Sequence, residues 1–225
     1  SGLKPKDLFS LSKLKTILST GSPLSNESFK YVYENIKSDV LLGSISGGTD
    51  IISCFALANP ILPVEEGELQ SKGLGMDVHA FDENGQKIIN KKGELVCTSI
   101  FPSMPIYFWN DPDRQKYQNA YFNKFENVWY HGDFIRISKN GSIKIYGRSD
   151  ATLNPGGVRI GTAEIYRVIE KMGEISDSLV IGQSWKDDQR IILFLKMKKG
   201  YMFNERVMET AKQMIKKGCS PRHVP

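Results

Sequence analysis

Short stretches that are apolar, or that alternate between apolar and polar residues, recur along the chain. They lie at residues 11–20, 40–42, 74–81, 93–98, 129–136 and 142–146. Such runs are typical of strands with a buried face. Turn-forming residues follow three of them, at 21–23, 82–85 and 139–141. The sequence therefore predicts short strands joined by tight turns, with one strand broken at Gly132 and another ending at Gly147.

Apolar residues recur at helical spacing in three further segments. Ser25, Thr162 and Asn204 stand in front of these segments and are the expected N-caps. The first helix is expected to reach about Ile36. Residues 101–121 contain prolines and aromatic side chains without periodicity, so we expect irregular packing there.

Two strands at 178–182 and 191–197 are expected to flank a turn at 186–188. Together with the last two helices they form a compact α+β module. The part before it combines an α/β segment with a small antiparallel, β-barrel-like sheet. The sequence therefore predicts domains at 1–149 and 150–225, with the boundary at Ser149-Asp150.

Composition narrows the class of protein. Of 225 residues, 40% are hydrophobic and 24% are charged, which is typical of globular domains rather than disordered chains. The net charge of +5 comes from scattered lysines, so a solvated surface is favoured over nucleic-acid binding. Three cysteines without paired spacing indicate buried free thiols in a reducing, cytoplasmic setting. No apolar run approaches membrane-spanning length, so we expect no membrane partner.

Two glycine-rich segments carry candidate chemistry. After the strand at 142–146, a loop holds Arg148, Asp150 and Arg159 among glycines. Guanidinium groups present planar donor forks that suit a phosphate or a ribose diol, although an ordinary surface turn is the alternative. Earlier in the chain, Gly47-Gly48-Thr49-Asp50 ends a second loop whose backbone N–H groups could hold a phosphate. There the Asp50 carboxylate could reach a magnesium ion, and a common Gly-Ser loop is the alternative.

Asp133 is a further candidate. An ionised carboxylate has two acceptor oxygens, which can bind both hydroxyls of a ribose. A turn aspartate without a ligand is the alternative for this residue.

Five motifs occur in the order and spacing of one family. They are Ser19-to-Pro23, Gly47-to-Asp50, Gly93-Glu94-Leu95, His131-Gly132-Asp133 and the stretch from Gly147 to Glu164. In these motifs the chain resembles adenylate-forming acyl-CoA synthetases, and among them the acetoacetate-activating members most closely. The resemblance covers essentially the whole chain. It implies an AMP-forming acid–thiol ligase that joins acetoacetate to coenzyme A, with ATP and Mg²⁺, through an acyl-adenylate.

The resemblance also implies roles for single residues. Gly21, Ser22 and Pro23 would line the adenine, while Gly47 and Gly48 would border the nucleotide and the acyl pocket. Thr49 would contact the α-phosphate, and Asp50 would help to hold magnesium.

The remaining roles fall in the second half of the chain. Asp133 and Arg148 would grip the ribose. Asp150 would be the hinge of a mobile small domain. Gly157 would border the pantetheine channel, and Arg159 would lie near the phosphate in one conformation.

Departures from the family pattern qualify these roles. Many relatives have Glu where this chain has Asp50, and Thr where it has His131. Acetate-activating relatives have bulky aromatics where this chain has Ser46 and Gly47. Small residues here should leave a roomier acyl pocket, so Gly47→Trp is expected to shift preference toward acetate.

The family's phosphate loop and catalytic lysine are not found in the chain. We therefore expect a fragment: the tail of the large domain plus most of the small domain, inactive by itself, with apolar surface exposed on residues 1–140. Two alternatives stay open. One is a ligase for another short-chain acid, and the other is a non-catalytic nucleotide-binding module.

Overall fold

The protein folds into two compact units, and each is described here by itself. The computed structural model describes residues 2–149, 151–153, 155, 160–186 and 188–225. The units are Ser1–Ile145 and Tyr146–Pro225. The assignment of 1–149 to the C-terminal part of a large AMP-binding domain, and of 150–225 to an incomplete, mobile small domain, stays a prediction. Among the described residues, no helix has the length and apolar character needed to cross a bilayer.

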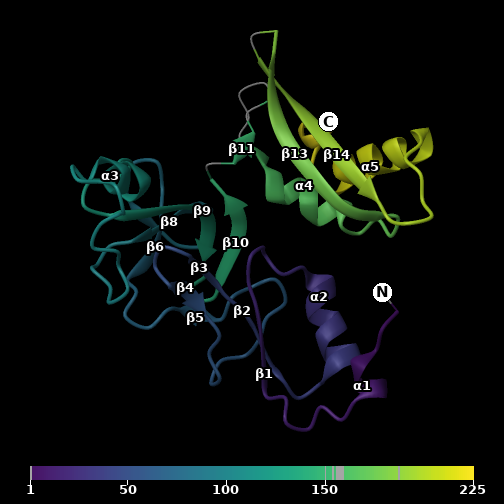
Figure 1. Cartoon of the computed structure of the whole chain (residues 1–225), viewed down its shortest axis with the longest axis horizontal. Coiled ribbons are helices and arrows are strands. Elements are labelled where there is room, and N and C mark those ends of the chain that lie inside the picture. Colours follow the sequence, from purple (N-terminus) through teal and green to yellow (C-terminus); the bar gives the residue numbers. More distant parts are fainter. Residues whose placement is uncertain (1, 150, 154, 156–159, 187) are drawn as a thin grey trace. The chain divides into compact units, whose positions relative to one another are not determined.

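The first unit begins with helices packed on a pair of strands. In chain order these elements are α1 (Pro5–Leu8), β1 (Thr16–Ser19), α2 (Asn26–Tyr31), the π-helix η1 (Val32–Ile36) and β2 (Leu41–Ser44). β1 and β2 pair in parallel, and α2 lies alongside them (Figure 1). Ser25 caps α2 as predicted, because its hydroxyl accepts the N–H of Ser28 at 3.2 Å. The helix also reaches Ile36 as predicted, although its last turn is π-helical.

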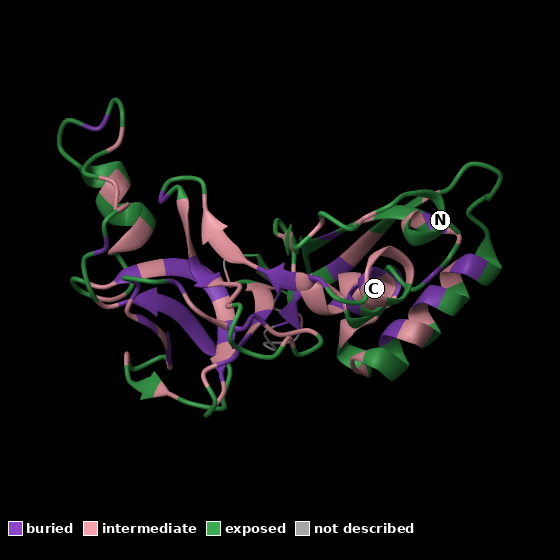
Figure 2. Ribbon diagram, turned by 90° about the horizontal axis from the view of Figure 1, so that it is seen from below, coloured by how far each residue is buried: buried purple, intermediate pink, exposed green. Residues whose placement is uncertain are grey.

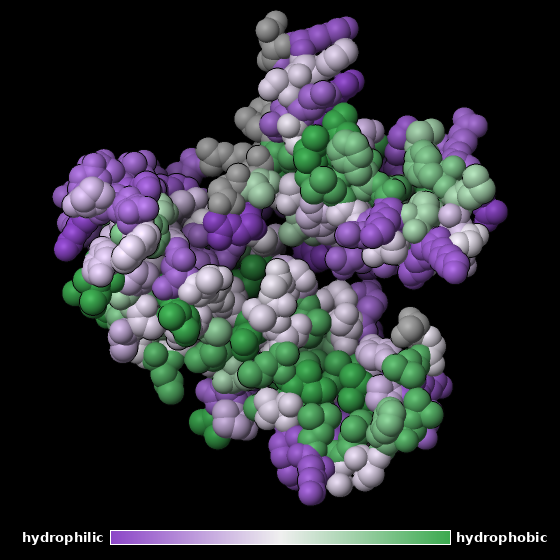
Figure 3. Space-filling model, in the orientation of Figure 1, coloured by the Kyte–Doolittle hydropathy of each residue, from purple (hydrophilic) through white to green (hydrophobic). Residues whose placement is uncertain are grey.

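This layer leaves apolar side chains in contact with solvent. Leu8 is 60% exposed, Phe9 64% and Leu18, on β1, 57%. Figure 3 shows apolar residues gathered over the region that holds α1, α2 and β1. Parallel strands are normally covered on both faces. In this layer apolar side chains are exposed instead, as expected for residues 1–140.

Two antiparallel sheets form the rest of the first unit, apart from residues 146–148 at the end of the last strand, which fall in the second unit. One has the order β3-β4-β5, and the other β10-β9-β8-β6-β7. Their strands are β3 (Ser46–Gly48), β4 (Ser53–Leu57), β5 (Ser71–Lys72), β6 (Val78–Phe81), β7 (Lys87–Ile88), β8 (Gly93–Cys97), β9 (Trp129–Ile137) and β10 (Ile143–Arg148). Most of the five-stranded sheet is coloured as buried in Figure 2. The core that the two sheets share includes Phe55, Leu95, Trp129 and Ile135, each at most 1% exposed.

The predicted small antiparallel sheet is therefore present, as is the hairpin turn at 82–85. The Asp82 carboxylate closes that turn by accepting the N–H groups of Asn84 and Gln86, each at 2.9 Å. The expected break at Gly132 is wrong, because β9 runs through it. Gly132 has a φ of +80° and accompanies a shift in register between β8 and β9. β10 likewise continues past Gly147 to Arg148.

The prediction of irregular structure at 101–121 is wrong at its end, where α3 (Gln115–Tyr121) forms. Arg114 stands at the N-cap position in the left-handed region, with a φ of 58° and no capping side chain. The Asp111 carboxylate instead accepts the N–H groups of Lys116 and Tyr117, each at 2.9 Å. The N-cap pattern does not predict this helix, because the side chain that caps it lies outside the usual N-cap position. The expected packing of Trp109 is also wrong, since that side chain is 85% exposed.

The second unit is an α+β module. Its elements are β11 (Thr152–Leu153), β12 (Ile160–Gly161), α4 (Thr162–Ile169), β13 (Ile175–Trp185), β14 (Asp188–Met197), α5 (Glu205–Gly218) and the 3₁₀ helix η3 (Pro221–His223). The helices cover one face of the β13–β14 hairpin (Figure 1). Asn204 caps α5 as predicted, accepting the N–H of Val207 at 3.0 Å. Thr162 is not the N-cap of α4: Gly161 holds that position, and its N–H donates to Glu164 at 3.4 Å.

The three cysteines are free thiols, as predicted. Only Cys97 is fully buried, whereas Cys54 and Cys219 are partly exposed. Burial raises the pKa of all three thiols above the usual value. Their thiolate fraction at neutral pH is therefore small, which is typical of inert structural cysteines.

The core of the second unit gives a direct test of the packing. Ile215 on α5 is 0% exposed, so Ile215→Ala leaves a cavity and should cost about 2–5 kcal/mol of unfolding free energy. Urea unfolding would measure this loss. Thr210→Ala, on the exposed side of the same helix, is the matched control and should change the value by less than about 0.5 kcal/mol. Equal losses of unfolding free energy in the two variants would contradict the described burial of Ile215.

Candidate functional site

The expected site residues fall into three groups. Asp150, Gly157 and Arg159 lie outside the described residues, so their expected roles stay predictions. Arg148 ends β10 and belongs to the second unit. All the others lie in the first unit, where the geometry can be described.

Gly21, Ser22 and Pro23 follow the end of β1. Gly21 has a φ of +93°, a conformation that glycine adopts without strain. At the same edge of the parallel pair, the N–H of Ile45 donates to the carbonyl of Ser19 at 2.9 Å. The turn at 21–23 and the segment entering β3 therefore start side by side, at the carboxyl end of the strands. That edge is where α/β sheets usually bind their ligands.

Gly47 and Gly48 are part of strand β3, which corrects the expectation that they lie in a glycine-rich loop. A Cβ on Gly47 would lie 2.0 Å from the carbonyl oxygen of Ser53 on β4. A Cβ on Gly48 would lie 2.9 Å from Cε1 of the His131 ring. The two glycines therefore permit two close approaches, one of backbone and one of an imidazole. Gly47→Trp would disturb the β3–β4 pairing, so it cannot report on the size of the acyl pocket alone.

Thr49 and Asp50 form the exposed turn that leaves β3. The N–H of Ile52 donates to the carbonyl of Thr49 at 3.2 Å, and Ile51 anchors the turn with 0% exposure. The Asp50 carboxylate accepts a hydrogen bond from the hydroxyl of Tyr121 at the end of α3. Both expected ligand-binding side chains of this turn are thus open to solvent.

His131 and Asp133 lie side by side on β9, and each is almost fully buried, at 8% and 7% exposure. The indole N–H of Trp129 lies 3.5 Å from His131 Nδ1 and donates to it. Because an indole can only donate, Nδ1 accepts and the proton of the neutral ring sits on Nε2. That nitrogen donates to the carbonyl of Gly47 at 3.3 Å and lies 3.7 Å from Asp133 Oδ2.

These contacts bring Gly47, Gly48 and Asp133 together around the His131 ring. Sequence reasoning singled out Asp133 but missed the partners Tyr121, Trp129 and His131 as site components. For Trp129 and His131 a signal existed, since they alternate with Asp133 at a period of two along one strand. Tyr121 gave none, because it lies 71 residues from Asp50 in the sequence.

The described side chains can be searched for groups that could ligate a magnesium ion. Among the residues that the structure describes, no group of three or more His, Cys, Asp or Glu side chains could hold a metal ion. Asp50 could supply one exposed carboxylate ligand. This fits the usual mode of Mg²⁺, which is held by one or two carboxylates together with water and substrate phosphates.

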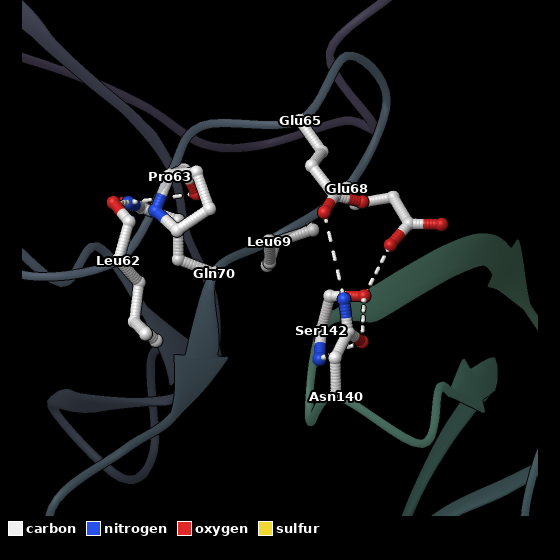
Figure 4. A pocket seen from close by; sticks show the side chains of 8 residues that line it. All are labelled: Leu62, Pro63, Glu65, Glu68, Leu69, Gln70, Asn140 and Ser142. Carbon is white, nitrogen blue, oxygen red and sulfur yellow. Dashed lines mark hydrogen bonds between the residues drawn. The ribbon is translucent and has the colours of Figure 1, made fainter.

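A separate cavity of about 110 Å³ lies elsewhere in the first unit. Figure 4 shows its lining: Leu62, Pro63, Glu65, Glu68, Leu69, Gln70, Asn140 and Ser142. Its polar groups already bond one another. The Gln70 amide donates to the carbonyls of Asn59 and Leu62 at 2.8 and 2.7 Å, and the Ser142 hydroxyl donates to Glu68. The cavity contains none of the expected site residues.

Several known proteins similar to this chain are described as acetoacetyl-CoA synthetases. Acetoacetyl-coenzyme A synthetase of Rhizobium meliloti (strain 1021) is 55% identical over 224 residues, covering 100% of this chain and 34% of that protein. Acetoacetyl-CoA synthetase of Xenopus tropicalis is 52% identical over 226 residues, with coverages of 100% and 34%. The solved acetoacetyl-CoA synthetase from Streptomyces lividans matches with a TM-score of 0.89 and 42% identity, again over 100% and 34%.

The chain therefore spans about a third of the length of the relatives that it matches. No family model matches it. The similarities confirm the resemblance to adenylate-forming acyl-CoA synthetases and the predicted fold class.

The close approach at Gly47 generates a prediction about stability. Gly47→Ala places a methyl group against the backbone of β4, so we expect a loss of about 1–3 kcal/mol in the free energy of unfolding. Gly173→Ala is the control, because a Cβ there meets no atom within 4 Å. Chemical unfolding of both variants would measure the difference. A Gly47→Ala protein as stable as the control would contradict the described pairing of β3 with β4.

Proposed function

We propose that this chain, homologous over its whole length to acetoacetyl-CoA synthetases, is part of an enzyme that ligates acetoacetate to coenzyme A. The observation that carries the proposal is the 55% identity over the entire chain to such a synthetase. On this proposal the longer protein, called here the parent-length protein, is active. The 225-residue chain alone is not, because the phosphate loop and the catalytic lysine expected for the family are not found in it.

The proposed reaction has two steps. In the first, a carboxylate oxygen of acetoacetate attacks the α-phosphorus of ATP, and the bond to pyrophosphate breaks. In the second, the thiol of coenzyme A loses its proton and attacks the acyl carbon of acetoacetyl-adenylate, and AMP leaves. Such chemistry depends mainly on positioning and on neutralising phosphate charge.

The residues of the first unit have proposed parts in the adenylation step. Gly21, Ser22 and Pro23 line the adenine from the carboxyl edge of β1. Thr49 donates its hydroxyl to the α-phosphate. Asp50 binds magnesium, which neutralises phosphate charge when it is bound. Both side chains are exposed, so they are accessible to a nucleotide.

Asp133 and Arg148 have the second proposed part, which is to bind the ribose. The Asp133 carboxylate accepts hydrogen bonds from the ribose hydroxyls, and Arg148 donates to the ribose. The supporting observation is that Asp133 is 7% exposed and its Oδ2 lies 3.7 Å from His131 Nε2. A carboxylate fixed in this way is preorganised for a diol. Arg159 near the phosphate, Gly157 at the pantetheine channel and Asp150 as the hinge complete the proposal without a described geometry.

The same proposal covers the partners and the location of the protein. Its partners are small molecules (acetoacetate, ATP and coenzyme A), and it includes neither a nucleic-acid nor a membrane partner. It also takes a cytoplasmic location, which the three free thiols support. A ligase for another short-chain acid is the second candidate, favoured if the small residues Ser46 and Gly47 do not set the acid preference.

Isotope exchange between ATP and pyrophosphate tests the proposal. In the parent-length protein, acetoacetate should support faster exchange than acetate, propionate or butyrate. Faster exchange with another acid would keep the chemistry and remove acetoacetate. No exchange with any acid would contradict the proposal and favour a non-catalytic nucleotide-binding module.

The role of Asp133 can be tested in the same assay. Asp133→Asn keeps the shape of the side chain but loses the charge that accepts both hydroxyls. We expect the KM for ATP to rise by about 10-fold or more, since hydrogen bonds to charged groups contribute about 1.5–3 kcal/mol each. Asp39→Asn, at an exposed position away from β9, is the control and should leave KM unchanged. An unaltered KM in Asp133→Asn would remove this residue from the ribose site.

A further inference from the structure

Tyr121 lies at the end of α3 and donates its hydroxyl to Oδ2 of Asp50. The two residues are 71 positions apart in the sequence. Asp50 sits in an exposed turn, where a lone aspartate would sample several rotamers. A hydrogen bond from a phenol to a carboxylate is charge-assisted and therefore among the stronger ones. The bond thus selects one orientation of the Asp50 carboxylate.

The Tyr121 ring is itself held in place by its neighbours. It stacks on Trp129 with centroids 3.6 Å apart and an interplanar angle of 15°. Phe108 and Tyr117 meet it edge-on, with centroids at 6.0 and 6.1 Å. Trp129 is 1% exposed, so the surface on which Tyr121 rests belongs to the core. The hydroxyl is therefore presented from a fixed position rather than from a mobile side chain.

The hydrogen bond occupies only one of the two carboxylate oxygens. Within the described part of the chain, Oδ1 of Asp50 makes no hydrogen bond, and its lone pairs remain available to a cation. A carboxylate with one oxygen held and the other open is suited to ligating a single divalent ion. Partners that orient a ligating group in this way typically change metal affinity or activity by 10–100-fold when they are removed.

We propose that Tyr121 is a positioning residue that orients the Asp50 carboxylate toward the magnesium ion of bound ATP. The inference rests on the proposed function, since it takes Asp50 as a ligand of nucleotide-bound magnesium. It adds a residue from α3, which none of the sequence motifs contains. Tyr121 acts through Asp50 and does not touch the nucleotide.

A structural role is the competing explanation, because the same bond could simply anchor α3. Tyr117 provides a matched control on the same helix. Its hydroxyl donates to the carbonyl of Pro105 at 2.7 Å, and its ring meets the same aromatic cluster. Tyr117→Phe therefore loses one hydroxyl hydrogen bond from α3 without altering Asp50.

The test is calorimetric titration of ATP into the parent-length protein at a series of Mg²⁺ concentrations. Tyr121→Phe keeps the stacked ring and removes only the hydroxyl. We expect the Mg²⁺ concentration that half-restores ATP affinity to rise by about tenfold. Affinity measured in EDTA should not change, and Tyr117→Phe should match the wild type in both conditions. A thermal melt of each variant checks that both are folded.

A double substitution separates positioning from anchoring. Asp50→Asn should weaken the Mg²⁺ dependence, and adding Tyr121→Phe to it should have no further effect on that dependence. Additive effects would overturn the inference, as would a Tyr121→Phe protein that matches Tyr117→Phe. Equal loss of affinity with and without Mg²⁺ would also overturn it. Failure of the wild-type protein to bind ATP would instead overturn the proposed function.

Discussion

The candidate site depends on the contact between the His131 ring and the glycine pair of β3. A Cβ at Gly48 would lie 2.9 Å from the ring, and His131 Nε2 lies 3.3 Å from the carbonyl oxygen of Gly47. The imidazole thus occupies the space that a side chain on β3 would fill. This close packing joins β9 to β3 and sets the distance between Asp133 and the turn that carries Thr49 and Asp50.

The aromatic cluster around Tyr121 links this contact to Asp50. Trp129 donates to His131 and also forms the surface on which Tyr121 stacks. Through Tyr121 the cluster reaches Asp50. Two carboxylates with different proposed tasks, Asp50 and Asp133, are therefore connected through one buried tryptophan. Residues with no proposed contact to a ligand thus determine how well the binding groups are preorganised.

Local features were predictable from the sequence, because their causes are local. Ser25 and Asn204 cap helices through their own side chains, and Gly141, with a φ of +90°, turns the chain where predicted. Features that depend on partners outside the usual local positions were missed. The start of α3 relies on Asp111, and the segment 46–48 is a strand because it pairs with β4. The Tyr121–Asp50 bond has no sequence signal, since it arises only from tertiary folding.

The central claim is that the parent-length protein forms an acyl-adenylate. The most direct test is mass spectrometry of the products made from acetoacetate and ATP in the absence of coenzyme A. The account predicts acetoacetyl-AMP and pyrophosphate, with acetoacetyl-CoA and AMP appearing once coenzyme A is added. Formation of ADP and an acyl phosphate, or no product, would contradict it.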